Sequence, residues 1–420
     1  MSTILLKQIS FNSQIKDVLI EGNKIAEIAD NIAVQADIVI DGKDRQLLPG
    51  FINMHTHASM TLVRGVEEDC PLQEWLEQIW KIESNMDEEM IYWGAKLAIL
   101  EMFQSGTTSF LDMYWMVPQV MQAVEEMGIR ANLSYVFLTH SDQAKAERQK
   151  RECMELYRAS RNWCDRCDFS VAIHADYTVD EKTMIWASNF AKEHGLLLNT
   201  HIAETQAETQ TDITNRGMSP VKYYDSLGIL DENTVAAHCV WLSDEDVEIL
   251  GKRKVNVVHN INSNLKLSSG YKFKYSELKA AGANICLGTD GAASSNNLDI
   301  LETMKTSSLL QKAWRGDPKA LPIDELMDLS SLNGANALNI NAGKIEKGAL
   351  ADLIIVDTRS AAFVPNVDFE ADLIFAANSS CIDSVICDGV LVMEHRRVKG
   401  EDEILDNVNR LAEKLLRTSK

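Results

Sequence analysis

Short apolar runs alternate with amphipathic stretches through the middle of this 420-residue chain. Eight runs have the length of buried strands, and stretches between them have helical periodicity, clearest at residues 89–103 and 184–193. Near-continuous apolar runs are typical of parallel strands buried on both faces. Eight β–α units over about 300 residues predict an α/β fold, a (β/α)8 barrel with insertions. The runs are LLPGFINMH, TTSFLDMY, IRANLSYVF, FSVAIH, LLLNTH, TVAAHC, VNVVHN and ANICLGTD.

Both ends of the chain have a different pattern. Residues 1–48 contain short strands separated by turn signals and no helix of useful length, and similar short strands return from residue 351. A chain of this length is expected to divide into two domains. We predict a small β-sandwich formed by both termini, residues 1–48 and 346–420, and a barrel of residues 49–345.

The segment 402–420 predicts a terminal amphipathic helix that packs on the body of the protein. Its apolar residues recur at helical spacing, as they do on the buried face of a surface helix. They are Ile404, Val408, Leu411 and Leu415.

Histidines gather where the apolar runs end. Six of the nine histidines lie at these ends, and the last run closes with Asp290. In (β/α)8 barrels the active site lies at the carboxyl ends of the strands. Imidazoles and a carboxylate that meet there bind a divalent metal. The six are His55, His57, His174, His201, His238 and His259.

Four of these residues form a predicted metal site. His55 and His57 flank one residue, so on a strand both imidazoles point to the same face. With His201 and Asp290 they supply three nitrogens and one carboxylate, which leaves a position open for water, as in catalytic sites. We predict one divalent ion and favour Zn²⁺ over Fe²⁺ and Mn²⁺. Two-metal barrels often place a lysine at the end of the fourth strand, where this chain has His174.

Glu204 and His238 are predicted to act beside the metal. Glu204 follows His201 by three residues and could shuttle a proton between a metal-bound water and a ring nitrogen, or simply stabilise a helix N-terminus. Asp290 is expected to accept a proton from the attacking water. His238 is predicted to hydrogen-bond the hydroxide, with a structural role as the alternative. The role of His259, in HNINSNLKLSSG, stays open between a barrel-rim contact and a substrate contact.

The bulk properties fit an ordinary globular protein that acts on a small molecule. The net charge of −21 argues against nucleic acid as a partner, and no apolar run approaches the roughly 20 residues of a membrane span. Eight cysteines without a disulfide spacing, and a start without signal-peptide features, predict a cytoplasmic protein. Cys164 and Cys167 form a CxxC without a second pair, so a zinc knuckle is not expected. Whether the chain forms a homo-oligomer is open.

At this point the sequence resembles the amidohydrolase superfamily over nearly its whole length. The resemblance rests on LLPGFINMHTH, HIAET, AAHCVWL, HNINSNLKLSSG, LGTDGAASSNNLD and GKIEKGALADLIIVD. Within the superfamily the chain is most similar to the 5-methylthioadenosine/S-adenosylhomocysteine deaminases. That similarity adds SGTTSFLDMY, the extended LGTDGAASSNNLDI and Glu83 in IWKIES.

The resemblance implies a hydrolase of C–N bonds in cyclic amidines, an aminohydrolase. A metal-activated water attacks C6 of an adenine nucleoside, ammonia leaves and the inosine analogue forms. The substrate would be 5′-methylthioadenosine, S-adenosylhomocysteine, 5′-deoxyadenosine or adenosine. The resemblance also implies that Glu204 protonates the ring, His238 polarises the hydroxide, Glu83 contacts the ribose hydroxyls and His174 lines the pocket. The metal ligands it implies are His55, His57, His201 and Asp290.

Two departures from the family pattern bear on the substrate. The usual HAPYT reads HADYT, so Asp176 replaces a proline beside the pocket. The arginines expected after the third strand, which suit the carboxylate of S-adenosylhomocysteine, are absent from SYVFLTH, although Arg148 and Arg151 follow. The sequence therefore leaves open whether the enzyme accepts substrates that carry an amino-acid group. Tyr114 and Trp115 offer a stacking surface or, more simply, pack in the core.

Two other functions compete with this interpretation. The same metal site could act on another aminated or halogenated heterocycle, such as a purine base or an s-triazine, and the triazine hydrolases are near relatives. Glu83 favours a ribose and therefore a nucleoside. A catalytically inactive barrel that serves as a scaffold is disfavoured because all four predicted ligands are present.

Overall fold

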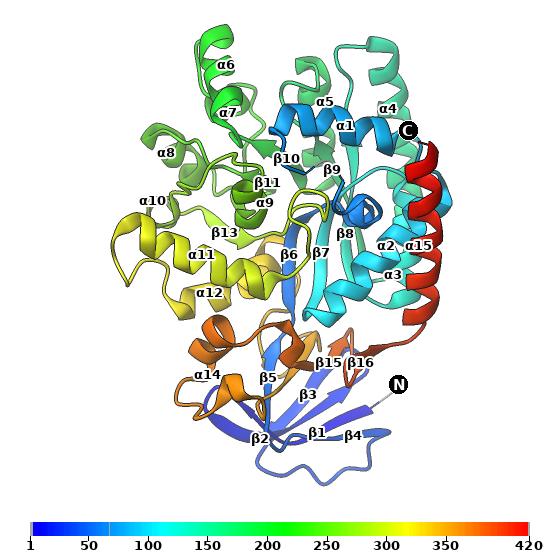
Figure 1. The fold of residues 1–420 in the computed structure, drawn as a ribbon, viewed down its shortest axis with the longest axis vertical. Coiled ribbons are helices and arrows are strands. Elements are labelled where there is room, and N and C mark those ends of the chain that lie inside the picture. The colour runs from blue at the N-terminus through cyan, green and yellow to red at the C-terminus, as the bar shows by residue number, and fades with distance from the viewer. Residues whose placement is uncertain (1–2, 67, 419–420) are drawn as a thin grey trace.

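The computed structural model describes residues 3–66 and 68–418, and its central feature is a barrel of eight parallel strands (Figure 1). The strands are β6 (Phe51–Thr56), β7 (Thr107–Met113), β8 (Arg130–Phe137), β9 (Cys167–Ile173), β10 (Leu198–Ile202), β11 (Thr234–His238), β12 (Asn256–His259) and β13 (Asn284–Leu287). Each strand pairs with the next one along the chain. Almost every residue in these strands is buried, which explains their continuous apolar runs.

The first and last barrel strands are joined by hydrogen bonds beyond the end of β13. The backbone N–H of Asp290 donates to the carbonyl of His55 at 3.0 Å, and the N–H of Thr289 donates to Oδ1 of Asn53 at 3.1 Å. Gly288 permits this approach, because a Cβ there would lie 3.0 Å from Cβ of His55. The barrel is therefore nearly closed, and the predicted fold class is confirmed.

Both termini contribute to a second, nine-stranded sheet below the barrel (Figure 1). Its strands are β1 (Thr3–Phe11), β2 (Gln14–Glu21), β3 (Lys24–Ala29), β4 (Ile38–Asp41), β5 (Arg45–Pro49), β14 (Leu353–Asp357), β15 (Ile382–Cys387), β16 (Val390–Glu394) and β17 (Arg397–Val398). β14 pairs with β5 on one side and β15 on the other, so it joins the two ends of the chain. The predicted unit built from both termini is thus present as one continuous sheet.

The first predicted barrel strand, residues 47–55, is two strands in two different sheets. β5 ends at Pro49 in the terminal sheet, and β6 begins at Phe51 in the barrel. Gly50 lies between them, where a Cβ would be 2.1 Å from Oγ1 of Thr108. Because β5 leads directly into β6, the amino ends of the barrel strands face the terminal sheet and their carboxyl ends face away from it (Figure 1). The domain boundaries stay a prediction.

Helices cover the barrel and follow most of its strands. They are α1 (Leu72–Glu83), α2 (Glu88–Gln104), α3 (Val117–Met127), α4 (Gln143–Ser160), α5 (Glu181–His194), α6 (Gln206–Arg216), α7 (Pro220–Ser226), α8 (Asp244–Lys252), α9 (Ile261–Lys266), α10 (Tyr275–Ala281), α11 (Ile300–Arg315), α12 (Ile323–Ser330), α13 (Leu332–Ala337), α14 (Phe369–Ala371) and α15 (Glu401–Thr418). Within residues 3–66 and 68–418 none is long and apolar enough to cross a bilayer.

The predicted terminal helix is α15, which packs along α2 (Figure 1, red). Its four apolar residues at helical spacing are all buried, as the periodicity predicts. The last two residues of the predicted segment, 419 and 420, lie outside the described residues.

Candidate active site

Three imidazoles and one carboxylate meet at the carboxyl ends of β6, β10 and β13. Nε2 of His57 lies 3.2 Å from Oδ1 of Asp290, and Nε2 of His55 lies 3.7 Å from the same oxygen. Nε2 of His201 lies 3.2 Å from Nε2 of His55. The four residues predicted as metal ligands from separate parts of the sequence therefore lie in one cluster. The ligand atoms of His55, His57 and Asp290 lie within 4.8 Å of one another, and so do those of His55, His201 and His238.

The hydrogen bonds around these imidazoles suit a bound cation. Nδ1 of His57 lies 2.6 Å from the carbonyl oxygen of Met113, and Nδ1 of His201 lies 2.6 Å from that of His174. A carbonyl only accepts, so each Nδ1 carries a proton, and in the neutral ring Nε2 then directs a lone pair into the cluster. Nitrogen lone pairs beside a carboxylate, with their rings fixed by backbone carbonyls, fit a divalent metal ion.

The charges of this cluster are consistent with that fit. Burial lowers the pKa of His57, but the hydrogen bond and charge of Asp290 outweigh it and raise the pKa to about 9. Burial raises the pKa of Asp290, yet His57 and the other imidazoles hold it well below its ordinary value. Burial, followed by neighbouring imidazoles, lowers the pKa values of His55 and His201. The ionised Asp290 and the neutral His55 and His201 are in the state that metal binding requires, whereas His57 must release its Nε2 proton when a cation binds.

His238 lies at the edge of the cluster with a different tautomer. Its Nε2 is 3.7 Å from Oε2 of Glu204 and 4.0 Å from Oδ2 of Asp290. Its Nδ1 lies 3.0 Å from the amide nitrogen of Asn264, which donates to it. Nε2 therefore carries the proton and points toward the carboxylates. In this arrangement His238 is a hydrogen-bond donor to a group between them, whereas its neighbours present lone pairs.

The backbone around Glu204 is fixed by the first turn of α6. The Glu208 carboxylate accepts from the N–H groups of Ala203, Glu204 and Thr205 at 2.9, 2.9 and 3.2 Å, and Thr205 caps the helix. The Oγ of Ser269 donates to Oε1 of Glu204 at 3.3 Å. Burial, and then the charge of Asp290, raises the pKa of Glu204 to about 8. This carboxyl therefore retains a proton more readily than an exposed glutamate does.

The cluster opens into a small inner cavity of about 50 Å³. Its walls include His57, His201, Glu204, His238 and Asp290, and α1 covers it with apolar side chains. The apolar residues that α1 contributes are Leu72, Trp75, Leu76 and Trp80. Such a cover excludes water from the polar groups below it, which strengthens their interactions.

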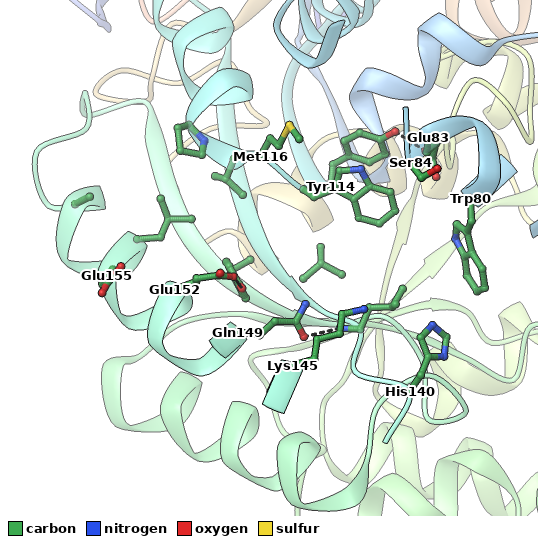
Figure 2. Close-up of a pocket in the computed structure, with 18 residues that line it drawn as sticks. Trp80, Glu83, Ser84, Tyr114, Met116, His140, Lys145, Gln149, Glu152 and Glu155 are labelled. Carbon is green, nitrogen blue, oxygen red and sulfur yellow. Dashed lines mark hydrogen bonds between the residues drawn. The ribbon is translucent and has the colours of Figure 1, made fainter. Parts of the chain in front are cut away.

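A larger outer cavity of about 800 Å³ (Figure 2) shares wall residues with the inner one. Both are lined by Trp80, Tyr114 and Trp115. Glu83 borders the outer cavity with only 4% of its surface exposed; Oε1 accepts from the Tyr114 hydroxyl, and Oε2 has no hydrogen-bond partner among the described residues. Burial raises the pKa of Glu83 to about 7 although the Tyr114 hydrogen bond lowers it. A buried polar atom without a partner in a cavity wall indicates a polar ligand.

Comparison with known proteins places this architecture in a family. Residues 46–392 match the model of the Amidohydrolase family. The chain belongs to the amidohydrolase family. The resemblance found in its sequence motifs is thereby confirmed, and the family is metal-dependent, in agreement with the cluster of histidines and aspartate.

Relatives named as deaminases match nearly all of this amidohydrolase. It is 41% identical over 392 residues to a 5′-deoxyadenosine deaminase of Methanothermobacter thermautotrophicus, which covers 93% of this chain and 91% of the relative. It is 41% identical over 379 residues to a 5-methylthioadenosine/S-adenosylhomocysteine deaminase of Thermococcus sibiricus, covering 90% and 89% of the two chains.

Among solved structures, an adenosine deaminase of Xanthomonas campestris with bound zinc superposes on this amidohydrolase with a TM-score of 0.93. The two are 27% identical, and the match covers 99% of this chain and 98% of the other. The zinc-complexed atrazine chlorohydrolase of Arthrobacter aurescens gives 0.89 at 20% identity, over 97% and 100% of the two chains. That second likeness shows the shared fold.

The two remaining histidines at strand ends differ in their surroundings. His174 lines the inner cavity of this amidohydrolase, with Nδ1 3.0 Å from Oγ1 of Thr178. His259 is buried outside that cavity and stacks on Phe273, with ring centroids 4.0 Å apart. Packing therefore describes His259 better than substrate contact. Tyr114 is buried and bonded to Glu83, while Trp115 lines both cavities.

Sequence reasoning missed three polar residues that support the site. Ser263 donates to Oδ2 of Asp290 at 2.6 Å, Asn264 orients His238, and Ser269 contacts Glu204. All three belong to HNINSNLKLSSG, the segment that follows β12. The signal available was the density of small polar residues directly after a buried strand, which is where a barrel builds its site.

Proposed function

We propose that this amidohydrolase is a metal-dependent deaminase that converts an adenine nucleoside and water to the inosine analogue and ammonia. The observation that carries the proposal is the meeting of His55, His57, His201 and Asp290 beside the buried Glu204. The relatives named as adenine-nucleoside deaminases, which align with about nine-tenths of the chain, support the substrate class.

The metal ligands in this proposal are His55, His57, His201 and Asp290, which hold one ion. Three imidazole nitrogens and one carboxylate oxygen favour Zn²⁺, while Fe²⁺ and Mn²⁺ accept the same donors. When bound, such a cation supplies the Lewis acidity that makes hydroxide available near neutral pH. A zinc-bound structural relative supports this choice of metal.

The protein groups around the ion manage the protons. Addition of water at C6 of adenine needs a proton on the adjacent ring nitrogen, and Glu204 is placed to deliver it. His238 donates a hydrogen bond from Nε2 to the entering oxygen, because Asn264 holds its tautomer. Asp290 accepts one proton of the attacking water and passes it to the departing amino group, and Glu204 recovers the second proton from the new C6 hydroxyl as ammonia leaves. The pKa of Glu204, raised to about 8 by burial, suits a group that must hold a proton at neutral pH.

Glu83 distinguishes a nucleoside from a bare heterocycle. Glu83 lines the outer cavity and its Oε2 has no partner among the described residues, so in this proposal that oxygen accepts a hydrogen bond from a ribose hydroxyl. A free purine base or an s-triazine would leave this buried acceptor unsatisfied, which costs about 1–3 kcal/mol. This supports a ribose-bearing substrate.

The residues that line the outer cavity bear on which 5′ substituent the substrate carries. Arg148 is largely exposed and pairs with Glu152 at 3.7 Å, and neither Arg148 nor Arg151 lines the cavity. Lys145 and Gln149 of α4 line it instead, on the side of the view opposite Tyr114 and Glu83 (Figure 2).

The α4 side of this cavity carries one ammonium, that of Lys145, and two carboxylates, those of Glu152 and Glu155. Lys145 has no ion-pair partner within the described chain, so its ammonium is available to a carboxylate. Glu152 already accepts from the Tyr135 hydroxyl at 2.7 Å and pairs with Arg148, so Glu155 is the second carboxylate on this wall that an ammonium could meet. We therefore keep S-adenosylhomocysteine among the proposed substrates, beside 5′-methylthioadenosine, 5′-deoxyadenosine and adenosine.

The test is a panel of these four nucleosides, assayed by ammonia release and by the absorbance change that accompanies loss of the adenine amino group. We expect turnover of at least one nucleoside by the zinc-loaded protein. Turnover of a purine base or an s-triazine, with none of any adenine nucleoside, would overturn the proposal.

A pair of lysine variants tests the 5′ assignment. Lys145→Met should raise KM for S-adenosylhomocysteine about tenfold, since a hydrogen bond to a charged group is worth about 1.5–3 kcal/mol, and should spare 5′-methylthioadenosine. Lys150→Met is the matched control, because Lys150 lies on the same helix but pairs with Glu147 outside the cavity. Equal effects on both substrates would remove Lys145 from the assignment.

A further inference from the structure

A buried cluster of charges ties the loop after β9 to the far end of α6. The guanidinium of Arg216 donates through Nη1 to the side chains of both Asp176 and Asp212, and through Nη2 to the backbone carbonyl of Asp176 at 3.2 Å. Asp176 and Asp212 are 4% and 5% exposed. The guanidinium also lies over the ring of Tyr223, 4.1 Å from its centroid. One cation therefore serves two buried carboxylates.

Fold stability alone does not explain this arrangement. Burying two carboxylates against one guanidinium carries a desolvation cost that the attraction often fails to exceed. Burial, followed by the neighbouring Asp212, raises the pKa of Asp176 above its ordinary value, which reflects that cost. The sequence pattern that this chain resembles has a proline at position 176, and a proline ring restrains the backbone without any charge. Here an ion pair supplies the restraint instead.

The two segments that the cluster joins both reach the active site. In the loop, His174 and Tyr177 line the inner cavity, and the His174 carbonyl accepts from Nδ1 of His201. At the other segment, α6 starts directly after Glu204, and its first turn fixes the Glu204 backbone. Arg216 is the last residue of this helix.

We propose that Asp176, acting through Arg216, is a positioning residue for the deaminase site. It holds the 174–178 loop against α6, so that the His174 carbonyl keeps the His201 ring turned with Nε2 toward the metal ligands. The same contact fixes the positions of His174 and Tyr177 relative to Glu204, which also lines the inner cavity. This inference rests on the proposed function, and it adds a residue that touches neither the substrate nor the metal ligands.

Asp176→Ala and Asp212→Ala form a matched pair for the test. Each removes one of two similarly buried carboxylates from the same arginine, but only Asp176 belongs to the loop. Zinc affinity is measured first, by competition with a chelator and without substrate. The values of kcat and KM are then measured with the best nucleoside, and thermal unfolding is recorded for both variants.

We expect Asp176→Ala to weaken zinc binding and to lower kcat, each by about 10–100-fold, as is typical when the orientation of a metal ligand is disturbed. KM should change less than kcat. Asp212→Ala should stay within about threefold of the wild type in both measurements. Asp176→Asn keeps the shape and a weaker, neutral hydrogen bond, so it should fall between Asp176→Ala and the wild type.

Three results would overturn the inference. The first is wild-type zinc affinity and kcat in Asp176→Ala. The second is an equal loss in Asp212→Ala, which would make the cluster merely structural. The third applies if Asp176→Ala does not fold: it is a folded Asp176→Asn protein whose zinc affinity and kcat equal those of the wild type. Failure of the proposed function would look different, because the wild-type protein would then bind zinc and deaminate no nucleoside.

Discussion

Replacement of Glu204 by glutamine tests the chemistry of the site most directly. The side chain is 9% exposed, and its Oε1 accepts one hydrogen bond, from Ser269 at 3.3 Å. Glutamine has the same shape and can keep that bond through its carbonyl oxygen, but it cannot give up a proton. Among the described residues, Glu204 belongs neither to the group His55, His57 and Asp290 nor to the group His55, His201 and His238, the two that could hold a metal. The substitution therefore removes proton transfer and leaves packing and metal binding in place.

The expected loss is large. General acid–base catalysis contributes roughly 10²–10⁴-fold, which corresponds to about 3–5 kcal/mol of transition-state stabilisation. We expect kcat of Glu204→Gln to fall by this factor, with KM changed little. Ser269→Ala is the control for the hydrogen bond alone. Since a neutral hydrogen bond is worth about 1 kcal/mol, it should cost about fivefold.

Deamination is followed by ammonia release under saturating nucleoside, and zinc content is measured on the same preparation. A Glu204→Gln protein that retains zinc and turns over at nearly the wild-type rate would remove Glu204 from proton transfer. A protein that loses its zinc would show instead that Glu204 supports the metal. The two failures are separated by the metal measurement.

Three further predictions follow from the same contacts. Asp290→Asn should lower both the affinity for zinc, measured by competition with a chelator, and kcat, measured by nucleoside turnover. Unchanged zinc binding would contradict the place of Asp290 among the metal ligands. Glu83→Gln should raise KM about tenfold for nucleosides with ribose hydroxyls and leave a 2′,3′-dideoxy analogue unaffected, whereas an equal change for both would refute the ribose contact. Burial raises the pKa of Asp17, but hydrogen bonds from Lys7 and from the backbone outweigh it and lower the pKa to about 2. The stability from Asp17 is therefore present above the unfolded-state pKa of about 4 and lost as the pH falls through 2. Asp17→Asn should reduce the free energy of unfolding by about 1–3 kcal/mol at neutral pH, and in urea titrations a reduction that stays constant down to the folded-state pKa would disprove this.

The sequence carried a strong signal wherever a regular element was involved. The eight apolar runs predicted the barrel because parallel strands buried on both faces must be apolar along their length. The histidines at their ends were informative because parallel strands in a barrel all direct their carboxyl ends to one face. His55, His57, His201 and Asp290 could therefore be grouped although more than 230 residues separate the first from the last.

Contacts between loops left no comparable signal. Nothing periodic links Asp176 to Arg216, or Ser269 to Glu204, and each pair is set by where a loop ends in space. The single run from Leu47 to His55 also concealed a change of sheet at Gly50, because both halves are apolar. The absence of family arginines after the third strand did not reveal that Lys145 lines the outer cavity.

The sequence by itself therefore determined the barrel, the pairing of the two termini, and the set of residues around the predicted metal. Strand periodicity and the common direction of the strands encode these features locally. Only the tertiary structure decided the tautomer of His238, the partner of Asp176 and the unsatisfied oxygen of Glu83. Those depend on hydrogen bonds between side chains that are distant in sequence, and such bonds form only after the barrel has brought the loops together.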